Sequence, residues 1–236
     1  MFRLVLFDID GTLALTNDAG VKAFAKVFET QFNAVDGFEK LKFHGRTDIS
    51  TIREFFSYHN IPDTTENIRR FHDHYLVWLE RFLNESNLQP LPGVQDFIRD
   101  LQGSSRPPML GLLTGNFRGG AERKLRRVGL WETFVTGAFA DDHEDRDKVA
   151  AVARARGNQL LGGDLRDHEV LVIGDTPLDI RCARAIGAKV LAVATGASTV
   201  EELKRHEPDW AVANLSEMSP TPTRDNPFLA AAGQGT

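Results

Sequence analysis

The stretch that decides the fold is Phe7-Asp8-Ile9-Asp10-Gly11-Thr12-Leu13, which stands at the end of an apolar run at residues 3–7. A short apolar run without alternation is typical of a central strand in a parallel sheet that is covered on both faces. In such sheets, ligands bind in the crevice outside the carboxyl ends of the strands. The stretch therefore predicts a buried strand that delivers Asp8 and Asp10 to a ligand crevice.

Four further strands are predicted from similar runs along the rest of the chain. They cover residues 109–113, 169–173, 190–194 and 210–213, and helix-like segments separate them. Strands that alternate with helices indicate an open α/β sheet. Thr114 follows the first of these runs, and Asp175 and Asp179 follow the second.

Residues 15–90 interrupt this alternation, because they contain no strand-like run. They hold three amphipathic segments with apolar residues at helical spacing, and aromatic residues such as Phe24, Phe28, Phe55 and Phe71 dominate the apolar stripes. Core packing is the interpretation we favour for these aromatic residues. The pattern predicts a helical unit inserted after the first strand.

The overall composition excludes several classes of protein. The chain has 236 residues, of which 26% are charged, and its formal net charge is -5. This mild acidity does not favour a nucleic-acid or membrane partner, which usually requires clustered basic residues. Cys182 is the only cysteine, so no intramolecular disulfide is possible, and the short N-terminal apolar run does not resemble a signal peptide. We expect a cytoplasmic protein, either a monomer or a homodimer, with a flexible tail at residues 219–236.

The acidic residues are expected to meet in one crevice. The predicted strands place Asp8, Asp10, Thr114, Asp175 and Asp179 at the carboxyl ends of the sheet. Carboxylates at such short separation raise one another's pKa unless a cation lies between them. Mg²⁺ prefers oxygen ligands and typically uses one or two carboxylates together with a substrate phosphate. The sequence therefore predicts a Mg²⁺ site.

The segments DIDGTL, LLTGN and VIGDTPLDIRCARAIGA together resemble the motifs of the haloacid dehalogenase-like (HAD) hydrolase superfamily. The helical insert is similar to the cap of its subfamily I, close to phosphoglycolate phosphatases and β-phosphoglucomutases. The resemblance implies an α/β fold with a Rossmann-like parallel sheet core at residues 1–14 and 91–218. It also implies an inserted all-helical cap domain at residues 15–90.

The resemblance also implies a function, the Mg²⁺-dependent hydrolysis of a small phosphate monoester such as phosphoglycolate through an aspartyl-phosphate. Asp8 would be the nucleophile, and Asp10 would act as general acid and then as general base. The Asp8 carboxylate, the Asp10 backbone carbonyl and Asp175 would hold Mg²⁺. The acid role requires a raised pKa, and we expect the neighbouring Asp8 and Asp175 to raise the pKa of Asp10.

We expect phosphate contacts from two loops, one after the predicted strand at residues 3–7 and one after the predicted strand at residues 109–113. Gly11 permits a sharp turn, so that amides near Thr12 point at phosphate oxygens. Thr114 would donate its hydroxyl to the same phosphate, and Gly115 and Asn116 would contact the substrate.

Two basic positions remain to be assigned. The cap segment HGRTDIS, residues 44–50, is similar to a substrate-specificity loop, which makes Arg46 a candidate contact with substrate. The alternative is a solvated arginine ahead of a helix capped by Asp48. The third motif usually supplies a lysine, for which Arg146 is our preferred equivalent and Lys148 the alternative. Asp179 would lie behind the ligands and orient Asp175 or the basic residue.

Other activities compete with phosphatase activity. A sugar phosphomutase would protect the aspartyl-phosphate from water. A 2-haloacid dehalogenase is disfavoured because Asp10 is present, and a phosphonatase would need a lysine in the cap, where only Lys40 and Lys42 lie near the segment. A receiver-type signalling domain carries its phosphate on the third strand and is much smaller.

Overall fold

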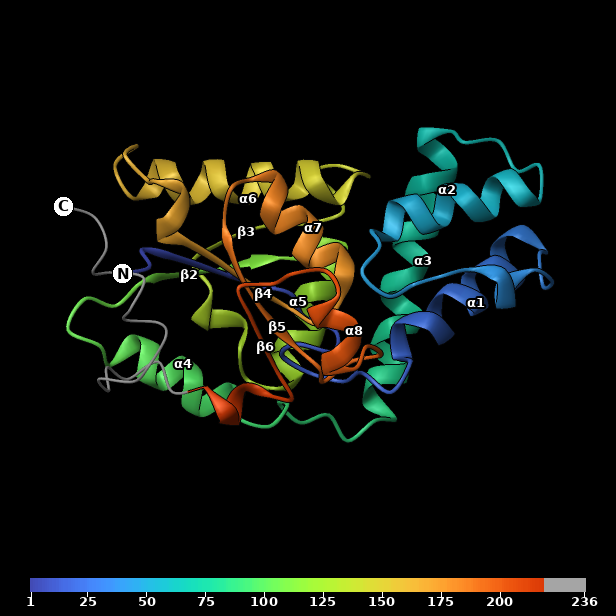
Figure 1. Cartoon of the computed structure of the whole chain (residues 1–236). Helices are drawn as coiled ribbons and strands as arrows, with labels where there is room; N and C mark the ends of the chain where they lie inside the picture. Colours follow the sequence, from blue (N-terminus) through green and yellow to red (C-terminus); the bar gives the residue numbers. More distant parts are fainter. Residues whose placement is uncertain (219–236) are drawn as a thin grey trace.

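The computed structural model describes residues 1–218, which form a parallel sheet with helices on both faces (Figure 1). The six strands of the described chain are β1 (Leu4–Phe7), β2 (Met109–Leu113), β3 (Thr136–Ala138), β4 (Val170–Gly174), β5 (Lys189–Val193) and β6 (Trp210–Val212). Their order is β3-β2-β1-β4-β5-β6, so that β1 lies inside the sheet between β2 and β4. The α/β fold class predicted from the sequence is confirmed.

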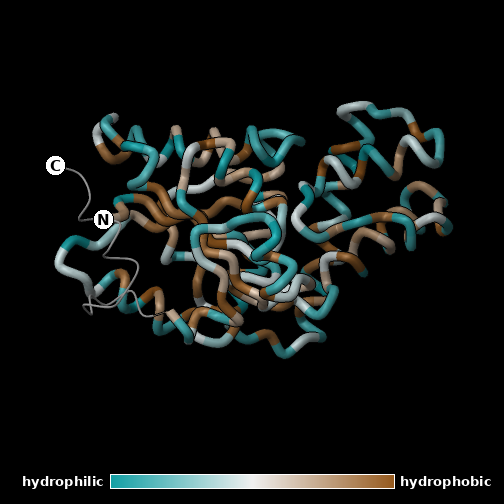
Figure 2. Tube along the Cα trace, in the orientation of Figure 1, coloured by the Kyte–Doolittle hydropathy of each residue, from teal (hydrophilic) through white to brown (hydrophobic). Residues whose placement is uncertain are grey.

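Side chains of β1 alternate between the two faces of the sheet, as the strand period requires. Val5 and Phe7 join a core that includes residues of α4 (Val94–Gln102) and α5 (Arg118–Arg127), whereas Leu4 and Leu6 face α6 (Arg146–Leu160), α7 (Pro177–Ala185) and α8 (Val200–Lys204). Figure 2 shows the resulting apolar band along the central strands. Because both faces are covered, the central strands read as unbroken apolar runs.

The sequence reading missed strand β3. This strand has only three residues, Thr136, Gly137 and Ala138, and it pairs with β2 at the edge of the sheet. Neither its length nor its composition produces an apolar run, so that only pairing with β2 identifies it as a strand.

Three helices fill the segment between β1 and α4, as predicted. They are α1 (Ala19–Phe32), α2 (Asp48–Tyr58) and α3 (Thr65–Asn84), and they lie beside the sheet in Figure 1. Their aromatic side chains pack against one another: the ring centroids of Phe28 and Phe55 are 3.8 Å apart, and those of Phe24 and Phe71 are 4.8 Å apart. The aromatic stripes are therefore core residues, as we interpreted them.

The N-terminus of α2 differs from the sequence interpretation. Thr47, not Asp48, is the N-cap, and its hydroxyl accepts a hydrogen bond from the Ser50 amide at 3.3 Å. Asp48 is the first residue of the helix, so its carboxylate is available for contacts outside α2.

Four short 3-10 helices complete the described chain, at Phe38–Lys40, Trp131–Thr133, Asp167–Glu169 and Leu215–Glu217. None of the helices within residues 1–218 has the length and apolar character needed to cross a membrane. The tail expected at residues 219–236 lies outside the described residues.

Candidate active site

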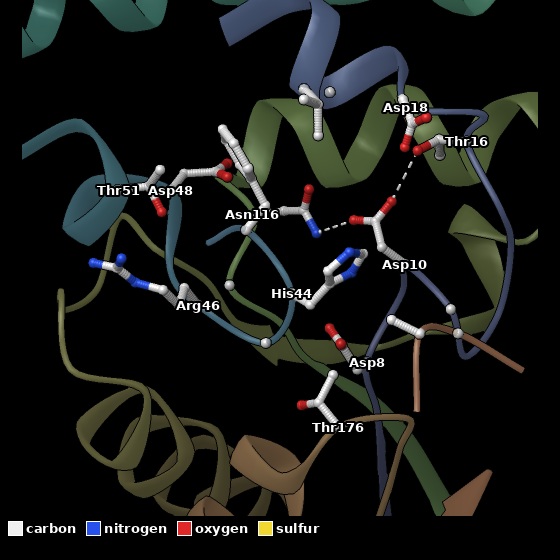
Figure 3. A pocket seen from close by; sticks show the side chains of 18 of the residues that line it. Asp8, Asp10, Thr16, Asp18, His44, Arg46, Asp48, Thr51, Asn116 and Thr176 are labelled. Atoms are coloured by element: carbon white, nitrogen blue, oxygen red, sulfur yellow. Dashed lines mark hydrogen bonds between the residues drawn. The ribbon is translucent and has the colours of Figure 1, made fainter. Parts of the chain in front are cut away.

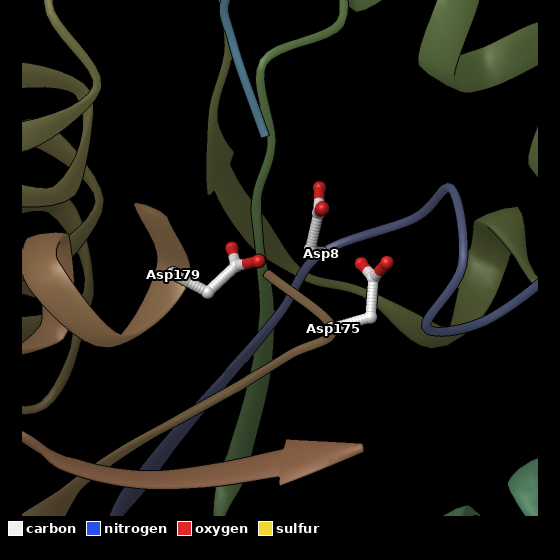
Figure 4. Close-up of side chains that lie close together, drawn as sticks. All are labelled: Asp8, Asp175 and Asp179. Atoms are coloured by element: carbon white, nitrogen blue, oxygen red, sulfur yellow. The ribbon is translucent and has the colours of Figure 1, made fainter. Parts of the chain in front are cut away.

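The carboxyl ends of β1 and β4 bring three aspartates together (Figure 4). Asp8 directly follows β1 and its amide donates to Ile173 of β4 at 2.9 Å, whereas Asp175 directly follows β4 and Asp179 lies in the first turn of α7. All three are buried, and carboxylate oxygens, one from each, lie within 4.8 Å of one another. The convergence predicted for these residues is thus present in the fold.

A buried arginine lies among these carboxylates. Arg146 is the first residue of α6, and its guanidinium lies 3.1 Å from Asp8 and also pairs with Asp179. A second N–H of the same group donates to the backbone carbonyl of Gly45 at 2.9 Å. Lys148, the other candidate for this position, is exposed. The structure therefore brings Arg146, and not Lys148, into contact with Asp8.

Burial is the largest cause of the pKa shifts of Asp8 and Asp175. Burial raises the pKa of Asp8 to about 6, with further increases from Asp179 and Asp10, although the charge of Arg146 opposes the shift. The pKa of Asp175 is raised well above its ordinary value, first by burial and then by Asp179 and Asp8. Crowded carboxylates of this kind are ionised together only when a cation compensates their charge.

The donor set fits a hard divalent cation. Asp179 already uses its carboxylate, because it accepts hydrogen bonds from the amide and hydroxyl of Thr176 at 3.0 and 2.7 Å and pairs with Arg146. The oxygens of Asp8 and Asp175 are the carboxylate donors that remain, and oxygen ligands are those preferred by Mg²⁺.

Two glycines enclose Asp175. A methyl group placed at Gly196 would lie 1.7 Å from the Asp175 carboxylate, and one at Gly11 would lie 2.4 Å from it. Gly11 also has a φ of +80°, which a residue with a side chain adopts only with strain. These positions require glycine for the carboxylate to occupy its place.

Asp10 belongs to a polar network that includes Asn116 and Thr16 (Figure 3). The ammonium group of Lys124 lies 2.6 Å from the Asp10 carboxylate and donates to the side-chain carbonyl of Asn116 at the same distance. Asn116 donates to Asp10 at 2.8 Å, and the Thr16 hydroxyl donates to it at 3.0 Å. Asp10 therefore has three hydrogen-bond donors, although its side chain is 40% exposed.

This network reverses the pKa shift that we expected for Asp10. Burial raises its pKa, but the charge of Lys124 and the hydrogen bonds from Lys124, Asn116 and Thr16 outweigh burial, so the net pKa is lowered. The net rise that we expected for the pKa of Asp10 was therefore wrong. The reason is that a buried ammonium contacts Asp10 directly and stabilises its charged form.

Lys124 was not among the residues predicted from the sequence. It lies on α5 and its side chain is only 4% exposed. The available signal was periodicity, because Lys124 shares the buried side of α5 with Gly120, Ala121 and Leu125. A lysine on the apolar side of a helix usually has a buried partner.

The predicted phosphate contacts lie around the same crevice. The Thr12 hydroxyl donates to Asp175 at 3.3 Å, and Gly11, Gly115 and Asn116 line the cavity described below. Thr114 is fully buried, and its hydroxyl oxygen accepts a hydrogen bond from the side-chain amide of Asn116 at 2.8 Å. Thr114 therefore contacts Asn116 and is not itself a lining residue of the cavity.

One cavity of about 400 Å³ connects the carboxyl end of the sheet with the helices α1–α3. The segment at residues 43–48 closes over it. The Asp48 amide donates to the carbonyl of Gly115 at 2.7 Å, and the Thr47 hydroxyl donates to the carbonyl of Glu144 at 2.5 Å. The Asp48 carboxylate in turn accepts a hydrogen bond from the Phe117 amide at 2.7 Å.

Two long side chains of this segment, Arg46 and His44, line the cavity. The guanidinium of Arg46 pairs with Glu54 and donates to the carbonyl of Ser50 at 3.3 Å, and in Figure 3 it points away from Asp8. His44, which was not predicted from the sequence, projects into the cavity toward Asp8 and Asp10 (Figure 3). Arg46 stays a candidate contact with the substrate.

Comparisons with known proteins identify a matching family. The model of the haloacid dehalogenase-like hydrolase family matches residues 5–193. The pyrophosphatase PpaX of Bacillus pumilus is 27% identical over 223 residues, which cover 91% of this chain and 93% of the relative.

Solved structures share the fold. CbbY from Rhodobacter sphaeroides, solved with phosphate, superposes with a TM-score of 0.71 at 18% identity, covering 92% of this chain and 96% of that chain. A hydrolase from Pseudomonas syringae gives 0.70 at 19% identity, covering 92% and 95%.

Proposed function

Because the chain belongs to the haloacid dehalogenase-like hydrolase family, we propose that it is a Mg²⁺-dependent phosphatase that hydrolyses a small phosphate monoester through a phosphorylated Asp8. The observation that carries this proposal is the buried contact of Asp8 with Arg146, beside Asp175, at the mouth of the cavity. The phosphatase name of a relative at 27% identity supports it.

In the first half of the reaction, the carboxylate of Asp8 attacks phosphorus. A bond forms between its oxygen and phosphorus, while the bond from phosphorus to the ester oxygen breaks. Arg146 holds the Asp8 carboxylate and provides positive charge beside the transferred group. Asp10, which is ionised in the ligand-free protein, has to take up a proton when the negatively charged substrate binds; it then donates this proton to the departing oxygen, so that the leaving group departs as an alcohol.

In the second half, water replaces Asp8 on phosphorus. The carboxylate of Asp10 takes a proton from the attacking water, the bond from the Asp8 oxygen to phosphorus breaks, and inorganic phosphate leaves. Lys124 keeps Asp10 ionised in the ligand-free protein, which is the form that this step requires.

Asp8, Asp175 and the backbone carbonyl of Asp10 are the groups that would hold Mg²⁺. The bound ion would neutralise negative charge on the carboxylates and the transferred phosphoryl group. Residues 15–90 would act as the cap domain over a core formed by residues 1–14 and 91–218. A small phosphorylated metabolite would be the partner of this site.

The competing reactions lack supporting contacts. A phosphonatase would need a lysine of the cap at the substrate, but Lys40 bonds to the Tyr58 hydroxyl at 2.7 Å, Lys42 is exposed, and neither lines the cavity. A 2-haloacid dehalogenase is disfavoured because Asp10 is present, here as an ion pair with Lys124. Among these alternatives, a sugar phosphomutase differs from a phosphatase in the fate of phosphorylated Asp8, which the test below follows.

The test is release of inorganic phosphate from a panel of monoesters, including p-nitrophenyl phosphate, with Mg²⁺ present. We expect turnover by the wild-type protein and by the control Asp73→Asn, whose carboxylate is exposed on α3. Asp8→Asn should lose all detectable turnover. Wild-type rates in Asp8→Asn would refute the nucleophile assignment. Accumulation of phosphorylated Asp8 from a sugar bisphosphate, without hydrolysis, would indicate the mutase.

A further inference from the structure

The end of the cavity that would receive the leaving group has an aromatic wall. Phe24, Phe43 and Tyr75 line it, with ring centroids of Phe24 and Phe43 at 5.5 Å and of Phe24 and Tyr75 at 5.0 Å. Phe24 and Tyr75 are almost fully buried in the described structure. Such a wall accommodates the carbon skeleton of a small ligand.

Two aspartates line the cavity besides those at the ends of the strands. Asp48 stands in the first turn of α2, and Asp18 directly precedes α1. Within residues 1–218, no basic side chain forms an ion pair with either carboxylate. The Phe117 amide bonds to one oxygen of Asp48 and leaves the other available to a ligand.

The basic side chains of the cavity are already neutralised. Three of them line it in the described chain: Arg146 pairs with Asp8 and Asp179, Lys124 with Asp10, and Arg46 with Glu54. His44 projects toward Asp8 and Asp10, at the phosphoryl end. No cation is therefore left over for a second negative group on the substrate.

We infer that the leaving group presents a hydroxyl or ammonium group to Asp48, packs its carbon atoms against the aromatic wall, and carries neither a carboxylate nor a second phosphate. The inference rests on the proposed phosphatase activity and refines it. It distinguishes this chain both from the phosphoglycolate-like substrate that the sequence suggested and from pyrophosphate, the substrate class named for its relative.

Three esters with the same two-carbon skeleton provide the test: 2-aminoethyl phosphate, 2-hydroxyethyl phosphate and phosphoglycolate. They differ in the terminal group, which is an ammonium, a hydroxyl or a carboxylate. We expect kcat/KM for the better of the first two to exceed that for phosphoglycolate by about 10-fold or more, the effect of one hydrogen bond to a charged group. Which of the two is better identifies the donor.

Variants of Asp48 link the preference to this side chain. Asp48→Asn retains an oxygen for the Phe117 amide but removes the charge, and it should reduce the preference against phosphoglycolate. Asp48→Lys should reverse it. Asp73→Asn, with its exposed carboxylate outside the cavity, should leave the ratio of kcat/KM values unchanged.

The outcomes separate the two proposals. Asp8-dependent hydrolysis of p-nitrophenyl phosphate together with equal rates on the three esters, or with phosphoglycolate as the best of them, would refute the inference and leave the phosphatase intact. Absence of Asp8-dependent hydrolysis of any ester would refute both.

Discussion

The side chain of Lys124 determines how Asp10 enters the reaction. A buried ammonium 2.6 Å from the carboxylate favours the ionised form, which takes a proton from water. The opposite requirement, a proton on Asp10 when the leaving group departs, has to be met after substrate adds its own negative charge to this network. Lys124 therefore influences both the ionised form of Asp10, which accepts a proton from water, and the protonated form, which donates to the leaving group.

Replacement of Lys124 by methionine tests this role. Methionine keeps the length of the stem but removes the charge, so the pKa of Asp10 should rise and the attack of water should slow. We expect kcat to fall by about 100-fold, the typical contribution of general acid-base catalysis. Acid-quenched samples should then show phosphorylated Asp8 accumulating during turnover.

Lys148→Met is the matched control, because Lys148 is exposed on α6. It should retain wild-type kcat. An unchanged kcat in Lys124→Met would show that the ion pair serves folding and not the reaction.

At the level of elements, Gly115 in the loop after β2 packs directly against residues 43–48, the segment before α2. A methyl group at Gly115 would lie 2.0 Å from the carbonyl oxygen of Arg46. Residues 43–48 thus reach the cavity only because glycine occupies position 115.

Gly115→Ala should displace the segment and weaken catalysis. We expect kcat/KM to decrease by about 10-fold or more, since small displacements of positioning groups have effects of this size. Steady-state kinetics with p-nitrophenyl phosphate measures it. The control is Gly129→Asn, where an added side chain meets nothing within 4 Å and asparagine tolerates the φ of +71°. Equal activity in both variants would argue against close packing of the segment on Gly115.

The turn before β4 provides a pH-dependent contribution to stability. Glu169 accepts hydrogen bonds from the side chain and the amide of Arg166, both at 2.9 Å, and its pKa is lowered to about 2, mainly by these bonds. Because the folded state has the lower pKa, the stabilisation is complete above the ordinary value of 4.5 and is lost as the pH falls toward 2.

Glu169→Gln should therefore lower the free energy of unfolding by about 1 kcal/mol at neutral pH. The difference from wild type should vanish as the pH approaches 2. Urea denaturation at a series of pH values measures it, with the exposed Glu201→Gln as control. A difference that is independent of pH would assign the effect to packing instead of charge.

At the scale of the whole molecule, the helices α1–α3 and the sheet share one site. Backbone and side-chain hydrogen bonds join residues 45–48 to Gly115, Phe117, Glu144 and Arg146. The cavity is thus lined partly by each unit, and its chemistry at one end is that of the sheet and at the other that of the helices.

Mg²⁺ should stabilise the whole chain as well as activate it. A ligand that binds only the folded state at about 100 times its Kd contributes about 2.7 kcal/mol, so the thermal midpoint should rise with Mg²⁺ concentration. Asp175→Asn should remove this rise. Excess chelator should abolish turnover, and added Mg²⁺ should restore it. Full activity in chelator, or an equal rise in Asp175→Asn, would refute the metal assignment.

The sequence by itself determined the strands that are buried on both faces and the placement of Asp8, Asp10, Thr114, Asp175 and Asp179 at their carboxyl ends. These features are local: an apolar run specifies the strand, and the residues that directly follow the run lie at its carboxyl end. The resemblance to the family's third motif also indicated Arg146, which was expected just ahead of a helix, whereas α6 begins at Arg146 itself.

Only the tertiary structure decided the remaining features. Strand β3 exists through pairing at the edge of the sheet, and Lys124 reaches Asp10 across 114 residues of sequence. His44 projects into the cavity toward Asp8 and Asp10 because the segment before α2 folds over the ends of the strands. Asp48 contacts Phe117 for the same reason. Contacts between distant segments are set by packing, and spacing along a single chain does not encode them.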